Sequence, residues 1–339
     1  MNGKANVVKK LISTPEFSSF IILIVMVIIT ASFQENFFEQ KSLVRTINAY
    51  LPLILMAMGQ AVVIISGGID LSAGSALSLL TVILTTIMNK ENPLSGFYAL
   101  VITYGVAILI GLVNGLGIGY LRLPPVIVTY ATSYIWLGIA LFIRPTPGGT
   151  TTEWFRMFYD FNSVSNMPPF MISLGKFLPP ALILILIGCI GWFIFSKTRM
   201  GRYIYAVGSN NDSAYASGIN TAWTQTVACI VNASFIFLTA IFFAAQNQSG
   251  DARMGDPLTL RAIAAAIVGG VALTGGRGNV YFALVGALIL SFVSKIIFFA
   301  NIPNAYQTLV SGVIVIGAIA ASLAYTLYSK RSIVKIGRQ

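Results

Sequence analysis

The chain has 339 residues, of which 56% are hydrophobic and only 9% are charged, and its formal net charge is +11. A soluble domain carries about 25% charged residues, so this composition excludes a soluble protein and indicates an integral membrane protein. Histidine, the commonest general base and metal ligand, is absent. We therefore expect no catalytic residue, no metal site and no cofactor bound by this chain. Positive charge in a membrane protein is typical of cytoplasmic loops, and it does not indicate nucleic-acid binding.

Continuous apolar stretches predict membrane-spanning helices, because the strands of a membrane barrel would alternate apolar and polar residues. The expected fold is all-α, a polytopic membrane protein of about ten transmembrane helices with two weakly related halves. The predicted spans are residues 16–34, 46–66, 72–89, 97–121, 125–143, 177–196, 222–246, 257–273, 279–300 and 305–328. The spans at 72–89 and 257–273 are short and flanked by glycine, so a broken or re-entrant helix is the alternative there.

The basic residues orient the chain. Lysines precede the first span, which has the character of an uncleaved signal anchor, and further basic residues gather at residues 197–202 and at the C-terminus. Both termini are therefore expected in the cytoplasm. Residues 144–176 then form an external loop, and Arg261 and Lys295 are counted with the external charges.

The second long polar stretch, residues 197–221, is expected to be a cytoplasmic loop. Gly201 and Gly208 predict turns within it. A capping signal at residues 211–213 predicts a short helix that ends at Gly218.

The segment between the second and third spans, residues 66–74, reads Ser-Gly-Gly-Ile-Asp-Leu-Ser-Ala-Gly. Its glycines predict a helix break, and irregular backbone at membrane depth occurs only where it is buried in protein or lines a cavity. Asp70 could contact a substrate, because charges within membranes mark functional sites. The spacing favours a structural role, in which its carboxylate caps the next helix by accepting the N–H groups of Ser72 and Ala73.

The pattern Gly-Gly-aliphatic-x-Leu-hydroxyl-small-Gly occurs at residues 67–74 and again at residues 269–276. Matching glycine interruptions in two halves point to the binding region of a transporter, although glycine pairs also permit close helix packing. Both segments, with one amide on the span between them, are the candidate substrate pathway. Its residues are Gly67, Gly68, Asp70, Ser72, Asn114, Gly269, Gly270 and Thr274.

The spans contain little charge, and amides such as Gln60 and Asn232 are expected mainly to bridge helices. A neutral polar solute therefore fits best, and an ion-coupled carrier is disfavoured, since such carriers need carboxylates or histidines within their spans. The chain has no phosphate-binding Gly-x-x-x-x-Gly-Lys-Ser/Thr loop, so energy would come from a partner.

In four of its segments the chain resembles the permease subunits of ribose-type carbohydrate ATP-binding cassette importers, in the wider group that includes branched-chain amino acid permeases. These segments are residues 66–75, residues 114–115 with 123–129, residues 198–208 with 217–220, and residues 269–278. They follow the family order over nearly the whole chain, so residues 1–339 are expected to form one transmembrane permease domain.

The resemblance implies that two permease subunits pair, as a homodimer or a heterodimer, above two cytoplasmic ATPase subunits that hold ATP and Mg²⁺. An extracytoplasmic sugar-binding protein would deliver the solute to a permease in the bacterial inner membrane. The resemblance further implies that residues 201–219 form helices that couple to the ATPases. The coupling candidates are Gly201, Arg202, Tyr205, Gly208, Asn211, Asp212, Ala214, Ser217 and Gly218.

The expected substrate is a monosaccharide, a pentose or a hexose, including furanose forms. Residues 145–160 do not follow the ribose permease pattern, and residues 212–216 replace the usual Glu/Ala-rich run, so ribose itself is not assigned. The alternatives are an ion-coupled secondary sugar carrier, a permease for another neutral polar solute such as a nucleoside or an autoinducer sugar, and a scaffold that transports nothing.

Overall fold

The structure is a computed structural model that describes residues 15–164 and 168–301, with single positions beyond them. The described residues form α-helices and two short 3-10 helices, and they contain no β-strand, which confirms the all-α prediction. The α-helices are α2 (Pro15–Phe33), α3 (Gln40–Ile65), α4 (Ala73–Ile87), α5 (Leu94–Gly119), α6 (Pro125–Ile143), α7 (Pro169–Phe177), α8 (Pro180–Lys197), α9 (Arg199–Ser209), α10 (Asn211–Ala216), α11 (Thr221–Asn247), α12 (Asp256–Val268) and α13 (Val280–Phe299). The 3-10 helices η1 (Glu153–Phe158) and η2 (Phe161–Ser163) precede α7.

Six of the described helices are long and apolar enough to cross a membrane, namely α3, α5, α6, α8, α11 and α13. Helices α2, α4 and α12 coincide with three further predicted spans. Residues Ser19–Phe33 of α2 and Ala73–Ile87 of α4 form shorter apolar helices, and α12 has 13 residues. Helix α3 extends the predicted span 46–66 toward the N-terminus, because it already begins at Gln40 with a polar first turn. The predicted span at residues 305–328 lies outside the described residues apart from single positions.

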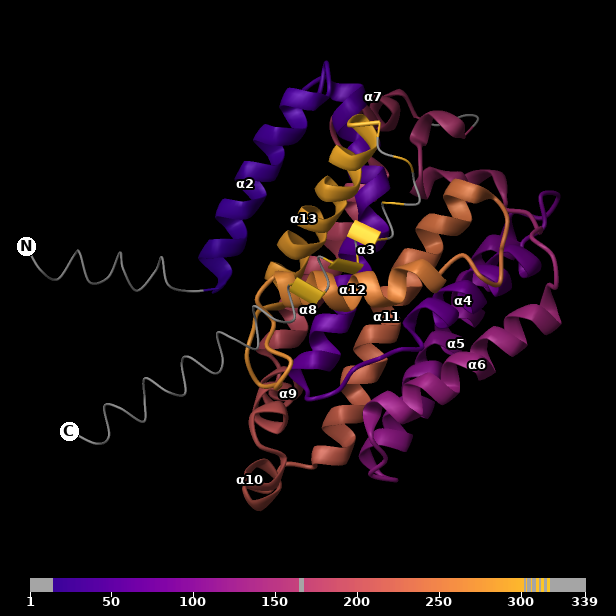
Figure 1. Cartoon of the computed structure of the whole chain (residues 1–339). Helices are drawn as coiled ribbons and strands as arrows, with labels where there is room; N and C mark the ends of the chain where they lie inside the picture. The colour runs from indigo at the N-terminus through magenta and orange to yellow at the C-terminus, as the bar shows by residue number, and fades with distance from the viewer. Residues whose placement is uncertain are drawn as a thin grey trace, which may run out of the picture.

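Helix α3 is the centre of the bundle. It packs against α8, α11, α12 and α13, and nearly all of its residues from Tyr50 onward are buried. Helices α4, α5 and α6 lie together beyond α11, whereas α2 packs on α13 at the opposite edge (Figure 1). The outward faces of α2, α5, α6 and α8 carry exposed apolar side chains, as expected of helices that face lipid.

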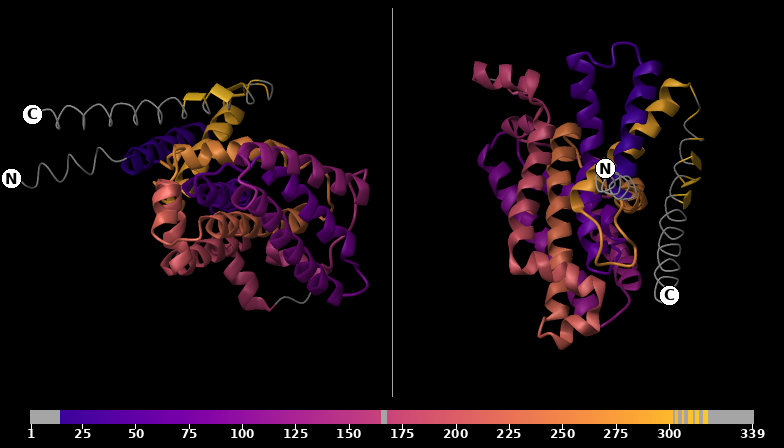
Figure 2. Two further views of the ribbon diagram at one scale, coloured as in Figure 1. Left: turned by 90° about the horizontal axis from the view of Figure 1, so that it is seen from below. Right: turned by 90° about the vertical axis from the view of Figure 1, so that its left-hand side faces the viewer.

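The two ends of the bundle differ. Helices α9 and α10 lie at one end, and the α2–α3 connection and α7 lie at the other (Figures 1 and 2). Helix α3 runs between these two ends, from the α2–α3 connection to its contact with α9.

The polar stretch at residues 197–221 is more helical than predicted. The expected turns at Gly201 and Gly208 are wrong, since both glycines lie inside α9, where they allow close packing against other backbone. The predicted short helix is confirmed as α10, but its cap is Asn210, whose Oδ1 accepts the Ser213 N–H at 2.8 Å. Gly218 follows with a φ of 80°, as expected of the residue that ends a helix.

Candidate functional site

Helix α3 ends in a glycine motif. The N–H of Gly67 donates to the Ile64 carbonyl and the N–H of Gly68 donates to the Val63 carbonyl, both at 2.9 Å. Gly67 has a φ of 90°. This pair of bonds around a left-handed residue is a Schellman motif, in which glycine is strongly preferred because it has no Cβ.

Helix α12 ends in the same motif. The N–H groups of Gly270 and Val271 donate to carbonyls of its last turn at 2.8 and 3.1 Å, and Gly270 has a φ of 94°. The structural counterpart of Gly67 is therefore Gly270, whereas the repeated sequence pattern aligned Gly67 with Gly269. The one-residue difference follows from the geometry, because only one residue of each break adopts the left-handed conformation.

The Asp70 carboxylate is buried in the first break and is 3% exposed as a residue. Its Oδ1 accepts the N–H of Ser72 at 2.8 Å and the hydroxyl of Ser72 at 2.6 Å. Its Oδ2 accepts the Nδ2 amide of Asn232 at 2.7 Å. The predicted capping bond from the N–H of Ser72 is present. The predicted bond from the N–H of Ala73 to the Asp70 carboxylate is absent from this part of the structure. Asn279 accepts the N–H of Tyr281 in the same way at 3.0 Å, just before α13.

The hydrogen bonds continue from Asp70 into four helices. Asn114 of α5 donates to the Ser72 hydroxyl at 2.8 Å, and Thr132 of α6 donates to Asn114 Oδ1 at 2.7 Å. Gln60 of α3 donates to the backbone carbonyl of Asp70. We call this set the Asp70 network, and its members are Gln60, Asp70, Ser72, Asn114, Thr132 and Asn232.

All side-chain donors to the Asp70 carboxylate are neutral. A buried charge needs hydrogen bonds in place of water, and here they come from the segment itself and from α11. The Asp70 network therefore joins α3, α5, α6 and α11 around the first break. The sequence analysis identified Gln60 and Asn232 as bridging amides but did not assign Thr132, whose only signal is a hydroxyl in an apolar run.

A second cluster brings both breaks to α9, and we call Gly67, Gly208, Gly275 and Gly276 the glycine junction. The Gly276 N–H donates to the Ile65 carbonyl at the end of α3 at 2.8 Å. A Cβ on Gly208 would collide with that same carbonyl and would lie 2.7 Å from the Gly276 nitrogen. A Cβ on Gly275 would lie 3.0 Å from the Gly67 Cα. Only glycine permits this approach of three backbone segments.

The remaining coupling candidates lie on α9 and α10 and differ in exposure. Ala214 is buried, whereas Arg202, Asn211 and Asp212 are exposed at the end of the molecule. Tyr205 is partly buried, and desolvation raises the pKa of its hydroxyl above the ordinary value. The exposed residues form a polar surface, while α9 itself is held against α3 and α8.

The structure separates the pathway candidates into groups. Asp70, Ser72 and Asn114 belong to the Asp70 network, and Gly67 belongs to the glycine junction. Gly269 instead permits close packing of α12 on α13, and Thr274 is exposed.

None of the eight pathway candidates lines the two cavities found at the α2–α3 end, of about 660 and 260 Å³. Arg261 and Lys295 fall within the predicted spans 257–273 and 279–300 and lie on α12 and α13, but they were counted with the external charges, so neither cavity was predicted. A charged residue within an apolar helix was the available signal.

The described residues form a bundle of membrane-length helices with two matching glycine breaks that meet a polar helical segment at one end, an arrangement expected of a membrane permease. The chain belongs to the family described as branched-chain amino acid transport system / permease component, whose model matches residues 42–319. This membership confirms the resemblance described above, and it confirms that the chain is a transporter subunit and not an enzyme.

Curated relatives cover most of the chain. A ribose import permease protein of Haemophilus influenzae is 28% identical over 90% of this chain and 92% of its own length. A D-allose transport system permease protein of Escherichia coli is 28% identical over 90% of both chains. An autoinducer 2 import system permease protein of Salmonella typhi is 25% identical over 90% of this chain and 84% of its own. No solved structure matches the chain.

Proposed function

We propose that this chain is the membrane-spanning permease of an ATP-driven importer that carries a monosaccharide inward. The observation that supports this most strongly is the family match over residues 42–319, joined by relatives that import ribose, D-allose and autoinducer 2. The permease works as one domain in the bacterial inner membrane, with both termini in the cytoplasm. A second permease subunit, two ATPase subunits that bind ATP–Mg, and an extracytoplasmic binding protein complete the importer.

The exposed α9–α10 end is the surface on which an ATPase acts. Movement of α9 is passed directly to both glycine breaks, because Gly208 touches the end of α3 and the Gly275–Gly276 turn. Closure of the ATPases then favours one of two arrangements of the bundle, and only a difference in contacts between those arrangements shifts their populations. The Asp70 network keeps the first break intact while the helices beside it move.

The solute passes along helices whose ends are set by the two breaks, so Gly67, Gly68, Gly269 and Gly270 act as hinges of the pathway. In this proposal Asp70 has a structural role and does not contact the solute, since its carboxylate oxygens are already occupied by Ser72 and Asn232. Thr274 is exposed and directly precedes Gly275 of the glycine junction, so its surroundings change when the junction moves.

The test is Gly208→Ala, compared with Gly105→Ala, a helical glycine whose added Cβ would meet nothing within 4 Å. Each variant is purified with its ATPase partner, and solute-stimulated ATP hydrolysis and uptake into vesicles are measured. We expect Gly208→Ala to give less folded protein, and the folded fraction to retain the ATPase but to lose most of the stimulation, whereas Gly105→Ala should match the unsubstituted chain. Uptake by the chain without any ATPase, or full stimulation in Gly208→Ala, would contradict the proposal.

A further inference from the structure

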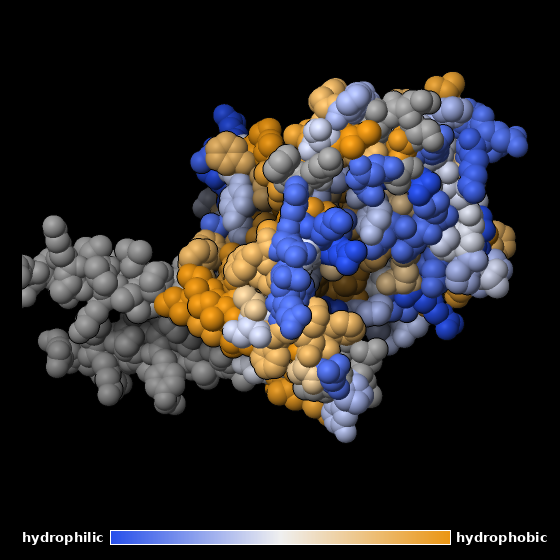
Figure 3. All heavy atoms as spheres, turned by 90° about the horizontal axis from the view of Figure 1, so that it is seen from above, coloured by the Kyte–Doolittle hydropathy of each residue, from blue (hydrophilic) through white to orange (hydrophobic). Residues whose placement is uncertain are grey.

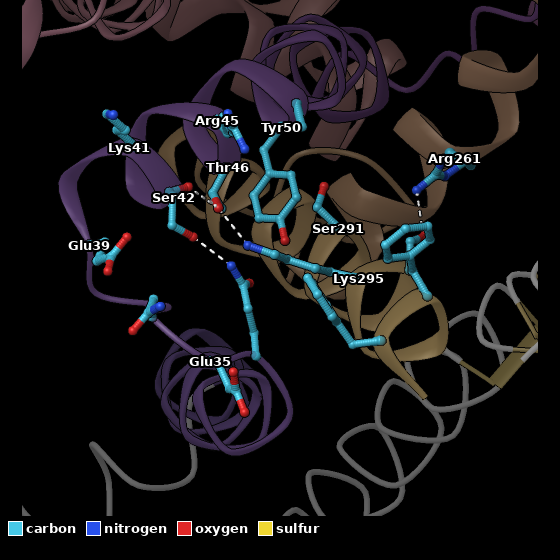
Figure 4. Close-up of a pocket in the computed structure, with 16 residues that line it drawn as sticks. Glu35, Glu39, Lys41, Ser42, Arg45, Thr46, Tyr50, Arg261, Ser291 and Lys295 are labelled. Carbon is cyan, nitrogen blue, oxygen red and sulfur yellow. Dashed lines mark hydrogen bonds between the residues drawn. The ribbon is translucent and has the colours of Figure 1, made fainter. Parts of the chain in front are cut away.

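A polar cavity opens at the α2–α3 end of the bundle, opposite α9 and α10. It lies between the α2–α3 connection, α3, α12 and α13 and has a volume of about 660 Å³ (Figure 4). A second cavity of about 260 Å³ adjoins it, since Arg261 and Ser291 line both. Hydrophilic side chains gather on this face of the molecule (Figure 3). Small-molecule sites typically occupy about 300–1,000 Å³, so the space fits a monosaccharide.

Two partly buried cations line the cavity without an acidic partner. The Arg261 Nη2 group donates to the Ser294 hydroxyl at 3.0 Å, and the Lys295 ammonium donates to the Thr46 hydroxyl at 2.5 Å and lies 5.0 Å from the centre of the Phe37 ring. Neither forms an ion pair with any carboxylate of the described residues. A cation away from water is costly unless it meets a negative charge or several hydrogen bonds, so both are suited to receive an anionic group.

The mouth of the cavity carries charges of both signs. Glu35 and Glu39 lie there on the α2–α3 connection, with Lys41 and Arg45 on the first turns of α3 (Figure 4). These four side chains are exposed and balance one another in sign. The excess of positive charge in the cavity therefore comes from the deeper pair, Arg261 and Lys295.

The walls also hold buried oxygens that lack a hydrogen-bond partner. The Tyr50 hydroxyl, on a residue only 6% exposed, has none among the described residues, and neither has Asn48 Oδ1, on a residue 9% exposed. Tyr50 lines the larger cavity and Asn48 lines the smaller one. A buried oxygen without a partner is costly, and a solute rich in hydroxyl groups supplies the missing donors. The Ser291 hydroxyl lies between the two cavities.

We propose that this cavity is a solute site for an acidic monosaccharide, with its carboxylate or phosphate on Arg261 and Lys295 and its hydroxyls on Tyr50, Asn48 and Ser291. The inference rests on the proposed permease function and names the substrate class more narrowly. It revises the expectation of a neutral solute, which followed from the scarcity of charge within the spans. Arginine binds carboxylate and phosphate through paired N–H groups, and four of the five N–H donors of Arg261 have no acceptor among the described residues.

The test uses the full chain in nanodiscs, with Ala49→Cys as a reporter, because Ala49 is exposed, lines both cavities and has no assigned role in binding. The rate of maleimide labelling is measured with D-glucuronate, D-glucose 6-phosphate or D-glucose present, and the unsubstituted chain gives the background from Cys189 and Cys229. We expect an acidic sugar to protect at a concentration about tenfold lower than D-glucose. Comparing glucuronate with glucose 6-phosphate distinguishes a carboxylate from a phosphate ligand.

Matched variants assign the effect to the cavity. Arg261→Gln and Lys295→Gln, each combined with the reporter, should lose the preference for acidic sugars, whereas Arg253→Gln, an exposed arginine outside the cavity, should keep it. Equal protection by D-glucose and the acidic sugars, or an unchanged preference in Arg261→Gln, overturns the inference. If the reporter variant does not fold, the shift in Tm of the unsubstituted chain with the same sugars decides the same question. ATPase co-purification and stimulation test the permease function separately, so the two failures are distinguishable.

Discussion

The Nδ2 amide of Asn232 on α11 donates a 2.7 Å hydrogen bond to Oδ2 of Asp70, and this bond fixes α11 to the break between α3 and α4. The other carboxylate oxygen is occupied by Ser72 within the break itself. The Asp70 charge is therefore held by donors from two parts of the chain, and its effect on stability can be tested from either side.

Asn232→Ala removes one of these donors and leaves a carboxylate oxygen buried without a partner. A loss of about 1–3 kcal/mol of stability is expected for such a group. Thermal unfolding of the purified chain in nanodiscs measures it. Ser234→Ala on the same helix is the control. The Ser234 hydroxyl donates to the Ile230 carbonyl four residues earlier and is 3.5 Å from the exposed Tyr104 hydroxyl, so its removal should change stability by no more than about 0.5 kcal/mol. Equal effects of the two substitutions would contradict the structural role of Asn232.

Asp70→Asn should be milder than Asp70→Ala. Asn232 Oδ1 has no partner among the described residues, so rotation of its amide allows it to accept a hydrogen bond from the new side-chain amide. We expect a cost of about 1 kcal/mol for Asp70→Asn and about 2–3 kcal/mol for Asp70→Ala, which leaves the donors of Ser72 and Asn232 unmet. Transport should fall only in proportion to stability. A changed preference among sugars in Asp70→Asn would instead assign Asp70 to the solute site.

Gly255→Ala should damage the fold at the start of α12. A Cβ there would overlap the Gly74 carbonyl, and the Gly255 N–H is already bonded to the Ser78 hydroxyl at 2.9 Å. Backbone shifts of this kind cost about 1–3 kcal/mol, and the yield of folded protein should fall. Gly138→Ala on α6 is the matched control, because its Cβ would meet nothing within 4 Å, and it should be neutral or slightly stabilising.

The capping residue of α10 is testable by two neighbouring substitutions. Asn210→Ala should destabilise α10 by about 1 kcal/mol, because Asn210 Oδ1 accepts the Ser213 N–H, whereas Asn211→Ala should not. Hydrogen exchange of the α10 amides measures the difference. A larger effect of Asn211→Ala would restore the cap that the sequence predicted and would contradict the structure.

The all-α fold and the order of the apolar helices up to residue 300 were predictable because each is a continuous apolar run, and six of these helices are long and apolar enough to cross a membrane. Hydropathy does not predict where a helix begins when polar residues continue it, as at Gln40, where the first turn of α3 faces the α2–α3 cavity. A glycine can also give a false prediction of a turn. Gly208 looks like a turn residue in the sequence, yet it lies in α9 because the end of α3 leaves no room for a side chain.

The candidate site was predicted only in part. The break at residues 66–72 and the role of Asp70 as an acceptor followed from local spacing. The bond from Asn232 joins residues 162 positions apart, and the cavity combines residues of α3 with others on α12 and α13, so neither is visible in any short stretch of sequence. Pairings of this kind depend on how the helices pack.

The distance along the chain between Asp70 and Asn232 also constrains how the protein is made. At a synthesis rate of about 5–20 residues per second, the ribosome needs roughly 8–32 s to make the 162 residues that separate them. During that interval the first break has emerged with its acidic side chain, while the helix that completes its hydrogen bonds does not yet exist. Ser72, only two residues away, is the donor that accompanies Asp70 from the start. Ser72 can therefore supply hydrogen bonds to Oδ1 of Asp70 before α11 has been made, and Asn232 supplies the bond to Oδ2 once α11 has been synthesised.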